Sequence, residues 1–171
     1  SELWDASLDV AVKNTAAAVE TSPYADVSTW HVANGGREGY DWWRVEGLNM
    51  LKRYVTFHDE TWRKTHTLLR ISQDGALTPV LEFGYEMELA GQRVKGFVDS
   101  AWVSLASTPP TIDIHDLKAG RSAPTSHFQL TEYAAALRQL LPTNFALPIR
   151  GTFWLARKGE YTSPVTLDAA A

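Results

Sequence analysis

The chain has 171 residues, no cysteine, 44% hydrophobic residues and a formal net charge of −4. This length can bury one proper core, so we expect a single domain over residues 1–171. The lack of cysteine excludes disulfides and fits a reducing cytoplasm. No apolar run approaches the ~20 residues that span a bilayer, and the acidic balance argues against a protein that coats nucleic acid.

The N-terminal part, to about residue 70, is predicted to be helical. One helix is expected over residues 3–20, followed by a loop through residues 23–39 that contains two adjacent glycines. A second helix is expected from Asp41 to His58, because mostly apolar residues recur along one side at helical spacing.

The core is predicted over about residues 78–160 and begins with an acidic strand. From Pro79 to Leu89, apolar side chains at odd positions alternate with other residues at even positions, which is typical of a half-buried strand. The turn at residues 90–93 then joins this strand to the next one in a hairpin. The even positions include Glu82, Glu86 and Glu88.

Two further strands each place a carboxylate in an apolar row. In the strand Val94–Val103, Asp99 shares its face with apolar residues. In the strand Thr111–Lys118, the even positions hold two isoleucines followed by Asp116 and Lys118, so all four share a face. A buried carboxylate needs a cation, which can be lysine, arginine or a metal ion. Two such carboxylates beside one lysine suggest a metal together with a catalytic amine.

A helix and a last strand complete the predicted core. Residues 129–141 have the spacing of an amphipathic helix, which Pro142 ends, and residues 150–157 form a last strand. Gln129 and Tyr133 are four residues apart, so they lie on one helical face and both can point at the carboxylates. The order strand, strand, strand, helix, strand indicates a mixed sheet.

Four motifs in this order resemble those of one nuclease superfamily. They are Glu82, GFVD at residues 96–99, DLKAG at residues 116–120 and QLTEY at residues 129–133. The set is similar to the RecB-type branch of the PD-(D/E)XK nucleases, which includes CRISPR-associated adaptation nucleases and the recombination exonucleases of phages and actinobacteria. That branch carries a GxxD strand, a strand ending in D/E-x-K and a helix with Q-x-x-x-Y. The resemblance covers most of the chain from about Asp41 onward.

The resemblance implies an α/β (α+β) fold with a restriction-endonuclease-like core, in which helices flank a central mixed β-sheet. It implies a metal-dependent deoxyribonuclease, expected to be an exonuclease in DNA recombination, repair or phage DNA processing. DNA, single- or double-stranded, is the expected partner, in the cytoplasm of a bacterium or a phage-infected cell. A homo-oligomer and a recombinase partner both stay open.

The resemblance also implies a role for each motif residue. Lys118 is expected to orient or deprotonate the attacking water, or to stabilise the pentacoordinate phosphorus. Gln129 and Tyr133 are expected to position Lys118 or the nucleic-acid strand. One or two Mg²⁺ or Mn²⁺ ions are expected, because these metals prefer hard oxygen ligands. The expected ligands are Glu82, Asp99, Asp116 and the carbonyl of Leu117, with Glu86 as the second choice for the upstream glutamate.

The chain departs from the family pattern in three respects. Many members use an upstream histidine as a further metal ligand, and the candidates here, His31 and His58, sit in no convincing motif. Without cysteines, no iron–sulfur cluster can form. The chain begins at Ser1 without the Cys-Pro-Arg-like element of the family, which leaves open whether the N-terminal part of the site has been trimmed.

Other interpretations stay open. The chain can be a catalytically inactive member that binds DNA or serves as a scaffold, although the intact acids and lysine argue against this. A weaker alternative is a non-enzymatic domain whose acids hold a structural Ca²⁺. His115 neighbours Asp116 but has the opposite parity, so its side chain should point away. Three tryptophans can either stack on single-stranded bases or pack internally. They are Trp42, Trp43 and Trp62.

Overall fold

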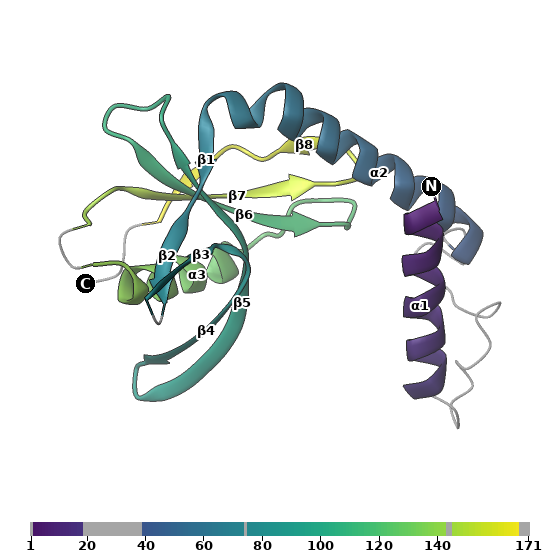
Figure 1. Cartoon of the computed structure of the whole chain (residues 1–171), viewed down its shortest axis with the longest axis horizontal. Helices are drawn as coiled ribbons and strands as arrows, with labels where there is room; N and C mark the ends of the chain where they lie inside the picture. Colours follow the sequence, from purple (N-terminus) through teal and green to yellow (C-terminus); the bar gives the residue numbers. More distant parts are fainter. Residues whose placement is uncertain (1, 19–38, 74, 143–144, 168–171) are drawn as a thin grey trace. The chain divides into compact units, whose positions relative to one another are not determined.

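The described part of the chain has an α+β fold with three α-helices and a curled, mixed seven-stranded sheet that forms a half-barrel (Figure 1). The class predicted from the sequence is therefore confirmed, and the restriction-endonuclease-like core stays a prediction. No helix among the described residues is long and apolar enough to cross a membrane. The computed structural model describes residues 2–18, 39–73, 75–142 and 145–167. By their contacts, Ser1–Val55 and Thr56–Ala171 form two compact units.

The first unit contains helix α1 (Glu2–Ala18) and most of helix α2 (Tyr40–Glu60). The indole Nε1 of Trp4 donates a hydrogen bond to the carbonyl of Arg44 at 2.9 Å. A side chain at Gly47 would overlap the indole of Trp4, so the glycine permits this close approach of the two helices. Both helices predicted in this part of the sequence are confirmed.

The second unit is built on the seven-stranded sheet. Its central path runs β1, β5, β6, β7 and β8, with β4 paired to β5 and β9 paired to β7. The β6–β7 pair is parallel and the other pairs are antiparallel. The strands are β1 (His66–Leu68), β4 (Leu81–Leu89), β5 (Gln92–Ser104), β6 (Thr111–Lys118), β7 (Ile149–Leu155), β8 (Glu160–Tyr161) and β9 (Val165–Thr166). A separate two-stranded sheet joins β2 (Arg70–Gln73) to β3 (Ala76–Pro79).

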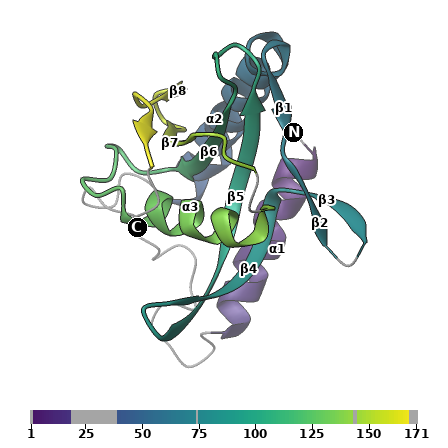
Figure 2. The same cartoon turned by 90° about the vertical axis from the view of Figure 1, so that its left-hand side faces the viewer.

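Helix α3 (Phe128–Leu140) lies across the inner face of the sheet, where it contacts β4, β6 and β7 (Figure 2). Its apolar stripe, with Leu130, Ala134 and Leu137 all at 1% exposure or less, packs into the core. The predicted amphipathic helix is confirmed, although it begins and ends one residue earlier than expected. This helix covers one face of β6, and the burial of that face positions the charged end of the strand.

Strand β6 is covered on both faces over its first six residues, Thr111 to Asp116. Such complete burial is typical of a strand in the middle of a sheet that is covered on both sides. The strand runs over the residues predicted from the sequence, and the hairpin of β4 and β5 that precedes it is confirmed. Short strands β1, β2, β3, β8 and β9 were not predicted.

Candidate metal and catalytic site

Asp99 and Asp116 face each other on neighbouring strands. In the β5–β6 register, Ser100 lies opposite His115 and Ala101 lies opposite Ile114, so the next position outward pairs Asp99 with Asp116. Asp99 is half-buried, and Asp116 is only 1% exposed. One carboxylate oxygen of Asp99, Oδ2, accepts a hydrogen bond from the backbone amide of Leu117 at 2.9 Å. The sheet thus fixes two acids side by side where β6 leaves the core.

The proximity of Asp99 affects the pKa of Asp116. Burial raises the pKa of the Asp116 carboxyl to about 6, and the negative charge of Asp99 adds to this rise, while the ammonium of Lys118 opposes it. Ionising both acids therefore costs free energy in the free protein, and a cation between them would offset that cost.

Lys118 lies on the same face of β6 as Asp116, as the alternation of the strand predicts. Its Nζ is 2.5 Å from Asp116 Oδ2. The contact is an ion pair, and it lowers the pKa of Asp116 against the opposing effect of burial. The ammonium also lies 5.8 Å from the ring centre of Phe153 on β7.

Helix α3 supplies the second half of the site. Lys118 Nζ donates to Gln129 Oε1 at 2.8 Å, and Gln129 Nε2 donates to the hydroxyl of Tyr133 at 2.6 Å. Burial raises the pKa of Tyr133 to about 12, and the charges of Asp99 and Asp116 act in the same direction. The tyrosine therefore stays a neutral hydroxyl at physiological pH. The structure thus brings together five of the predicted residues, which are Asp99, Asp116, Lys118, Gln129 and Tyr133.

The upstream glutamates have different positions. Glu82 lies between the paired residues Leu81–Ser100 and Phe83–Val98, which puts it opposite Asp99 in the register. Its φ of 47° is a left-handed conformation that is uncommon for residues other than glycine. Its side chain is exposed, and no three His, Asp or Glu side chains among the described residues lie close enough together to hold a metal.

Glu86, the second choice for the upstream ligand, is engaged elsewhere. It forms ion pairs with Arg93 and, at 2.9 Å, with Lys95 on the neighbouring strand. The hydrogen bonds that Arg93 and Lys95 donate in these ion pairs lower the pKa of the Glu86 carboxyl. The backbone of Leu117 does lie beside the acids, although the contact with Asp99 is made by its amide and not by its carbonyl.

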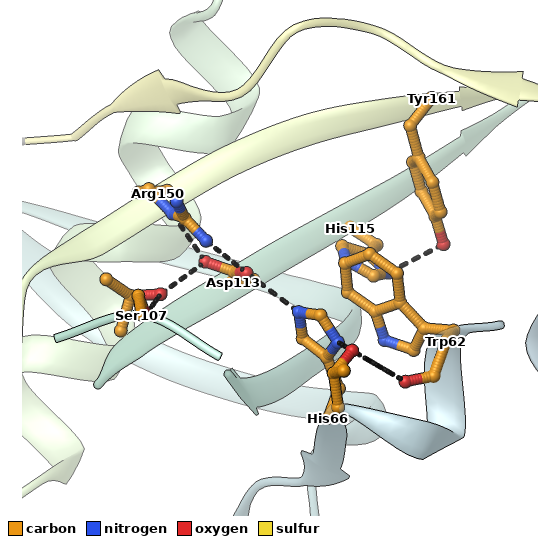
Figure 3. A network of polar contacts seen from close by, with 9 residues as sticks. Trp62, His66, Ser107, Asp113, His115, Arg150 and Tyr161 are labelled. Carbon is orange, nitrogen blue, oxygen red and sulfur yellow. Dashed lines mark hydrogen bonds and ion pairs between the residues drawn. The ribbon is translucent and has the colours of Figure 1, made fainter. Parts of the chain in front are cut away.

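Of the two histidine candidates, the structure describes His58, which lies away from the acids. His31 falls outside the described residues. His58, in the last turn of α2, is buried, and its Nε2 lies 2.9 Å from the hydroxyl of Tyr161, which in turn lies 2.8 Å from Nδ1 of His115. His115 is therefore on the face of β6 opposite to Asp116, as its parity predicts. Figure 3 shows His115 and Tyr161 on this side of the strand.

A second buried charge, Asp113, lies on the same face of β6 as His115 and was missed by the sequence analysis. Arg150 on β7 binds both of its carboxylate oxygens, at 2.8 and 2.7 Å (Figure 3). His66 Nε2 lies 3.2 Å from Oδ2, and the hydroxyl of Thr111 donates to Oδ1 at 3.0 Å. Because every partner comes from β1, β6 or β7, this network links three strands. In the sequence, the position of Asp113 between two isoleucines of a predicted strand could have indicated a buried, paired carboxylate.

Tryptophan side chains make internal contacts. Trp62 stacks on His66 with ring centres 3.5 Å apart and planes at 17°, so that face of the indole is already covered. Trp42 and Trp43 contact each other edge to face at 4.9 Å. For Trp62, packing is therefore the better explanation than stacking on bases.

Protonation of His58 is expected to weaken the fold in acid. Burial, with a further contribution from the charge of Arg63, lowers the pKa of His58 from 6.5 to about 4. The unfolded chain therefore takes up this proton first as the pH falls, and stability is lost between pH 6.5 and 4. When the pH is lowered from 7 to 5, protonation of His58 should lower the free energy of unfolding by about 2 kcal/mol.

Denaturant unfolding of the wild-type chain and His58→Gln at both pH values measures this loss. The variant lacks the titrating imidazole. The unfolding free energy of the wild type minus that of the variant should therefore be about 2 kcal/mol smaller at pH 5 than at pH 7. Asp116 titrates with the opposite sign, because its folded pKa is raised, but it is common to both proteins. An unchanged difference between the two proteins would contradict the assignment.

The chain is similar to one protein from a bacteriophage. Gene 69 protein of Mycobacterium phage D29 is 26% identical over an alignment of 157 residues, which covers 81% of this chain and 55% of the phage protein. The chain thus spans about half the length of that relative. No model of a known protein family matches the chain.

Proposed function

We propose that the chain is a divalent-metal-dependent nuclease that hydrolyses phosphodiester bonds of DNA. The observation that carries the proposal is the convergence of Asp99, Asp116 and Lys118, named here the Asp–Lys site. Two adjacent carboxylates provide hard oxygen ligands, and a fixed ammonium beside them provides a positive charge for a phosphate. The order of β4, β5, β6, α3 and β7 supports a restriction-endonuclease-like core of the RecB type.

Two carboxylates on the protein side are compatible with a magnesium site. Mg²⁺ is usually held by one or two carboxylates together with waters and the phosphates of the substrate. Asp99 and Asp116 would therefore hold the ion together with the DNA, and the ion would offset the cost of ionising Asp116, whose pKa is raised by burial and by the charge of Asp99. When bound, such an ion lowers the pKa of a coordinated water and offsets charge on the phosphate.

The remaining residues act by holding these groups in place. The amide of Leu117 fixes one oxygen of Asp99 and leaves the other for a ligand. Asp116 and Gln129 hold the Lys118 ammonium from two sides, so it can orient the attacking water or stabilise charge on the phosphate without reorganisation. Tyr133 accepts a hydrogen bond from the Gln129 amide and so holds that side chain toward Lys118.

The DNA substrate and a role in recombination, repair or phage DNA processing follow from the RecB-type resemblance. The similarity to a phage protein supports a phage context. An exonuclease is proposed on the same basis, with a homo-oligomer or a recombinase as partner.

One observation favours a second candidate, a catalytically inactive nuclease fold that binds DNA or serves as a scaffold. Among the described residues, no third acid or histidine joins Asp99 and Asp116 in a metal-binding group. The intact Asp–Lys site argues against this candidate.

Labelled linear single- and double-stranded DNA, incubated with Mg²⁺, Mn²⁺ or EDTA, tests the proposal. We expect cleavage that requires metal, with product lengths that shorten progressively for an exonuclease. Asp116→Asn, purified in parallel, controls for a contaminating nuclease. A folded wild-type chain that binds DNA without cutting it in either metal would overturn the proposal in favour of the inactive fold.

Glu82→Gln tests whether the exposed glutamate opposite Asp99 joins the metal site when substrate binds. We expect the Mg²⁺ concentration for half-maximal cleavage to rise by about tenfold or more, as for the loss of a group that supports a metal. Glu88→Gln is the matched control, because Glu88 is exposed on the same strand but lies opposite Arg93. Equal Mg²⁺ requirements of the two variants would exclude Glu82 as a ligand.

A further inference from the structure

Phe128, the first residue of α3, presents an exposed aromatic ring one residue before Gln129, the side chain that holds Lys118. It is 69% exposed, the highest value for a large apolar side chain among the described residues of the unit Thr56–Ala171. The next residue is Gln129, whose Oε1 lies 2.8 Å from Lys118 Nζ. Consecutive Cα atoms are about 3.8 Å apart, so the Cα of Phe128 lies next to that of the residue that holds Lys118.

The backbone that carries Phe128 is held by local hydrogen bonds. Its amide donates to the hydroxyl of Ser126 at 3.1 Å, and the carbonyl of His127 accepts from the amide and hydroxyl of Thr131 at 3.0 and 3.1 Å. The imidazole of His127 also lies parallel to the ring of Phe153, with centres 6.0 Å apart and planes at 17°. The start of α3 is thus fixed over the strand that lies beside Asp116.

We propose that Phe128 is the stacking platform for an unpaired nucleobase next to the phosphate that enters the Asp–Lys site. The inference rests on the proposed function, and it extends that function by naming the substrate class as single-stranded or frayed DNA. An aromatic ring stacks on any base and therefore needs no sequence preference. Within a duplex, both faces of a base are already covered by its neighbours, so only an unpaired or terminal base can use the ring.

Cleavage kinetics of Phe128→Ala test the proposal, with Phe128→Trp as the variant that keeps a stacking ring. On single-stranded DNA, we expect kcat/KM of the alanine variant to fall on the order of tenfold and that of the tryptophan variant to stay near the wild-type value. On an oligonucleotide with abasic sites beside the scissile phosphate, wild type and Phe128→Ala should cleave equally. Leu105→Ala, which truncates another exposed side chain at 65% exposure, is the matched control.

Binding without cleavage separates this proposal from the nuclease activity. Single-stranded DNA containing the fluorescent base 2-aminopurine, titrated in EDTA, should be quenched by the wild-type chain and not by Phe128→Ala. Quenching by a wild-type chain that never cleaves would retain the platform and reject the nuclease. Equal quenching by both proteins, equal losses on normal and abasic DNA, or no quenching by wild type would overturn the platform.

Discussion

Replacement of Lys118 by alanine is expected to lower the rate of metal-dependent DNA cleavage by about 10²–10⁴-fold, the usual contribution of a positioned acid–base or charge-stabilising group. The ammonium is held between Asp116 at 2.5 Å and Gln129 at 2.8 Å, so its positive charge is fixed beside the acids. Single-turnover cleavage with saturating enzyme measures the chemical step, and KM for Mg²⁺ should change much less.

Lys95→Ala is the matched control for this loss. Lys95 is 64% exposed and pairs with Glu86 at 2.9 Å on the hairpin, away from the acids. Its removal takes the same charge from the chain, so a general electrostatic effect on DNA binding would appear in both variants. Equal rates for the two variants would contradict a specific role of Lys118.

Asp113→Ala is expected to destabilise the fold by about 3–5 kcal/mol, the range for breaking a buried ion pair by removal of one partner. The substitution leaves Arg150 without its bidentate carboxylate and leaves His66 and Thr111 without an acceptor. These groups come from three strands, so the loss should appear as a lower midpoint of a single cooperative transition in denaturant, measured by circular dichroism.

Glu86→Ala supplies the comparison for the stability measurement. Glu86 also binds two cations, Arg93 and Lys95, but on the exposed face of the hairpin. Surface ion pairs contribute little because water screens them and their side chains lose entropy. We expect its denaturation midpoint to stay near that of the wild type. Similar midpoints for both variants would mean that burial does not set the strength of the Asp113 network.

The long elements of the fold could be predicted from the sequence because their periodicity extends over enough residues. The hairpin alternates over nine residues of β4, and α3 repeats its apolar stripe over thirteen residues. The strands from His66 to Pro79 have three or four residues each, and β8 and β9 have two. Alternation over so few residues carries no signal, and these strands form because neighbours in the sheet offer backbone partners.

The candidate site likewise has residues whose positions the sequence predicts and residues whose positions it does not predict. Parity alone places Asp116 and Lys118 together, and the antiparallel register of β5 and β6 brings Asp99 to them. The position of Glu82 depends on a left-handed backbone conformation that no residue pattern announces. The Asp113 network depends on Arg150 and His66, which are 37 and 47 residues away in the chain. Contacts of this kind are set by the sheet order and not by local sequence.

Uptake of Mn²⁺ in the presence of DNA, followed by electron paramagnetic resonance, tests most directly whether Asp99 and Asp116 hold a divalent ion. Lys118→Ala serves as the starting protein, because it keeps both acids and should not consume the DNA. With the DNA-alone signal subtracted, the account predicts a saturable Mn²⁺ site that is lost when Asp99→Asn or Asp116→Asn is added. Undiminished Mn²⁺ binding in those double variants, or none in the starting protein, would contradict the account.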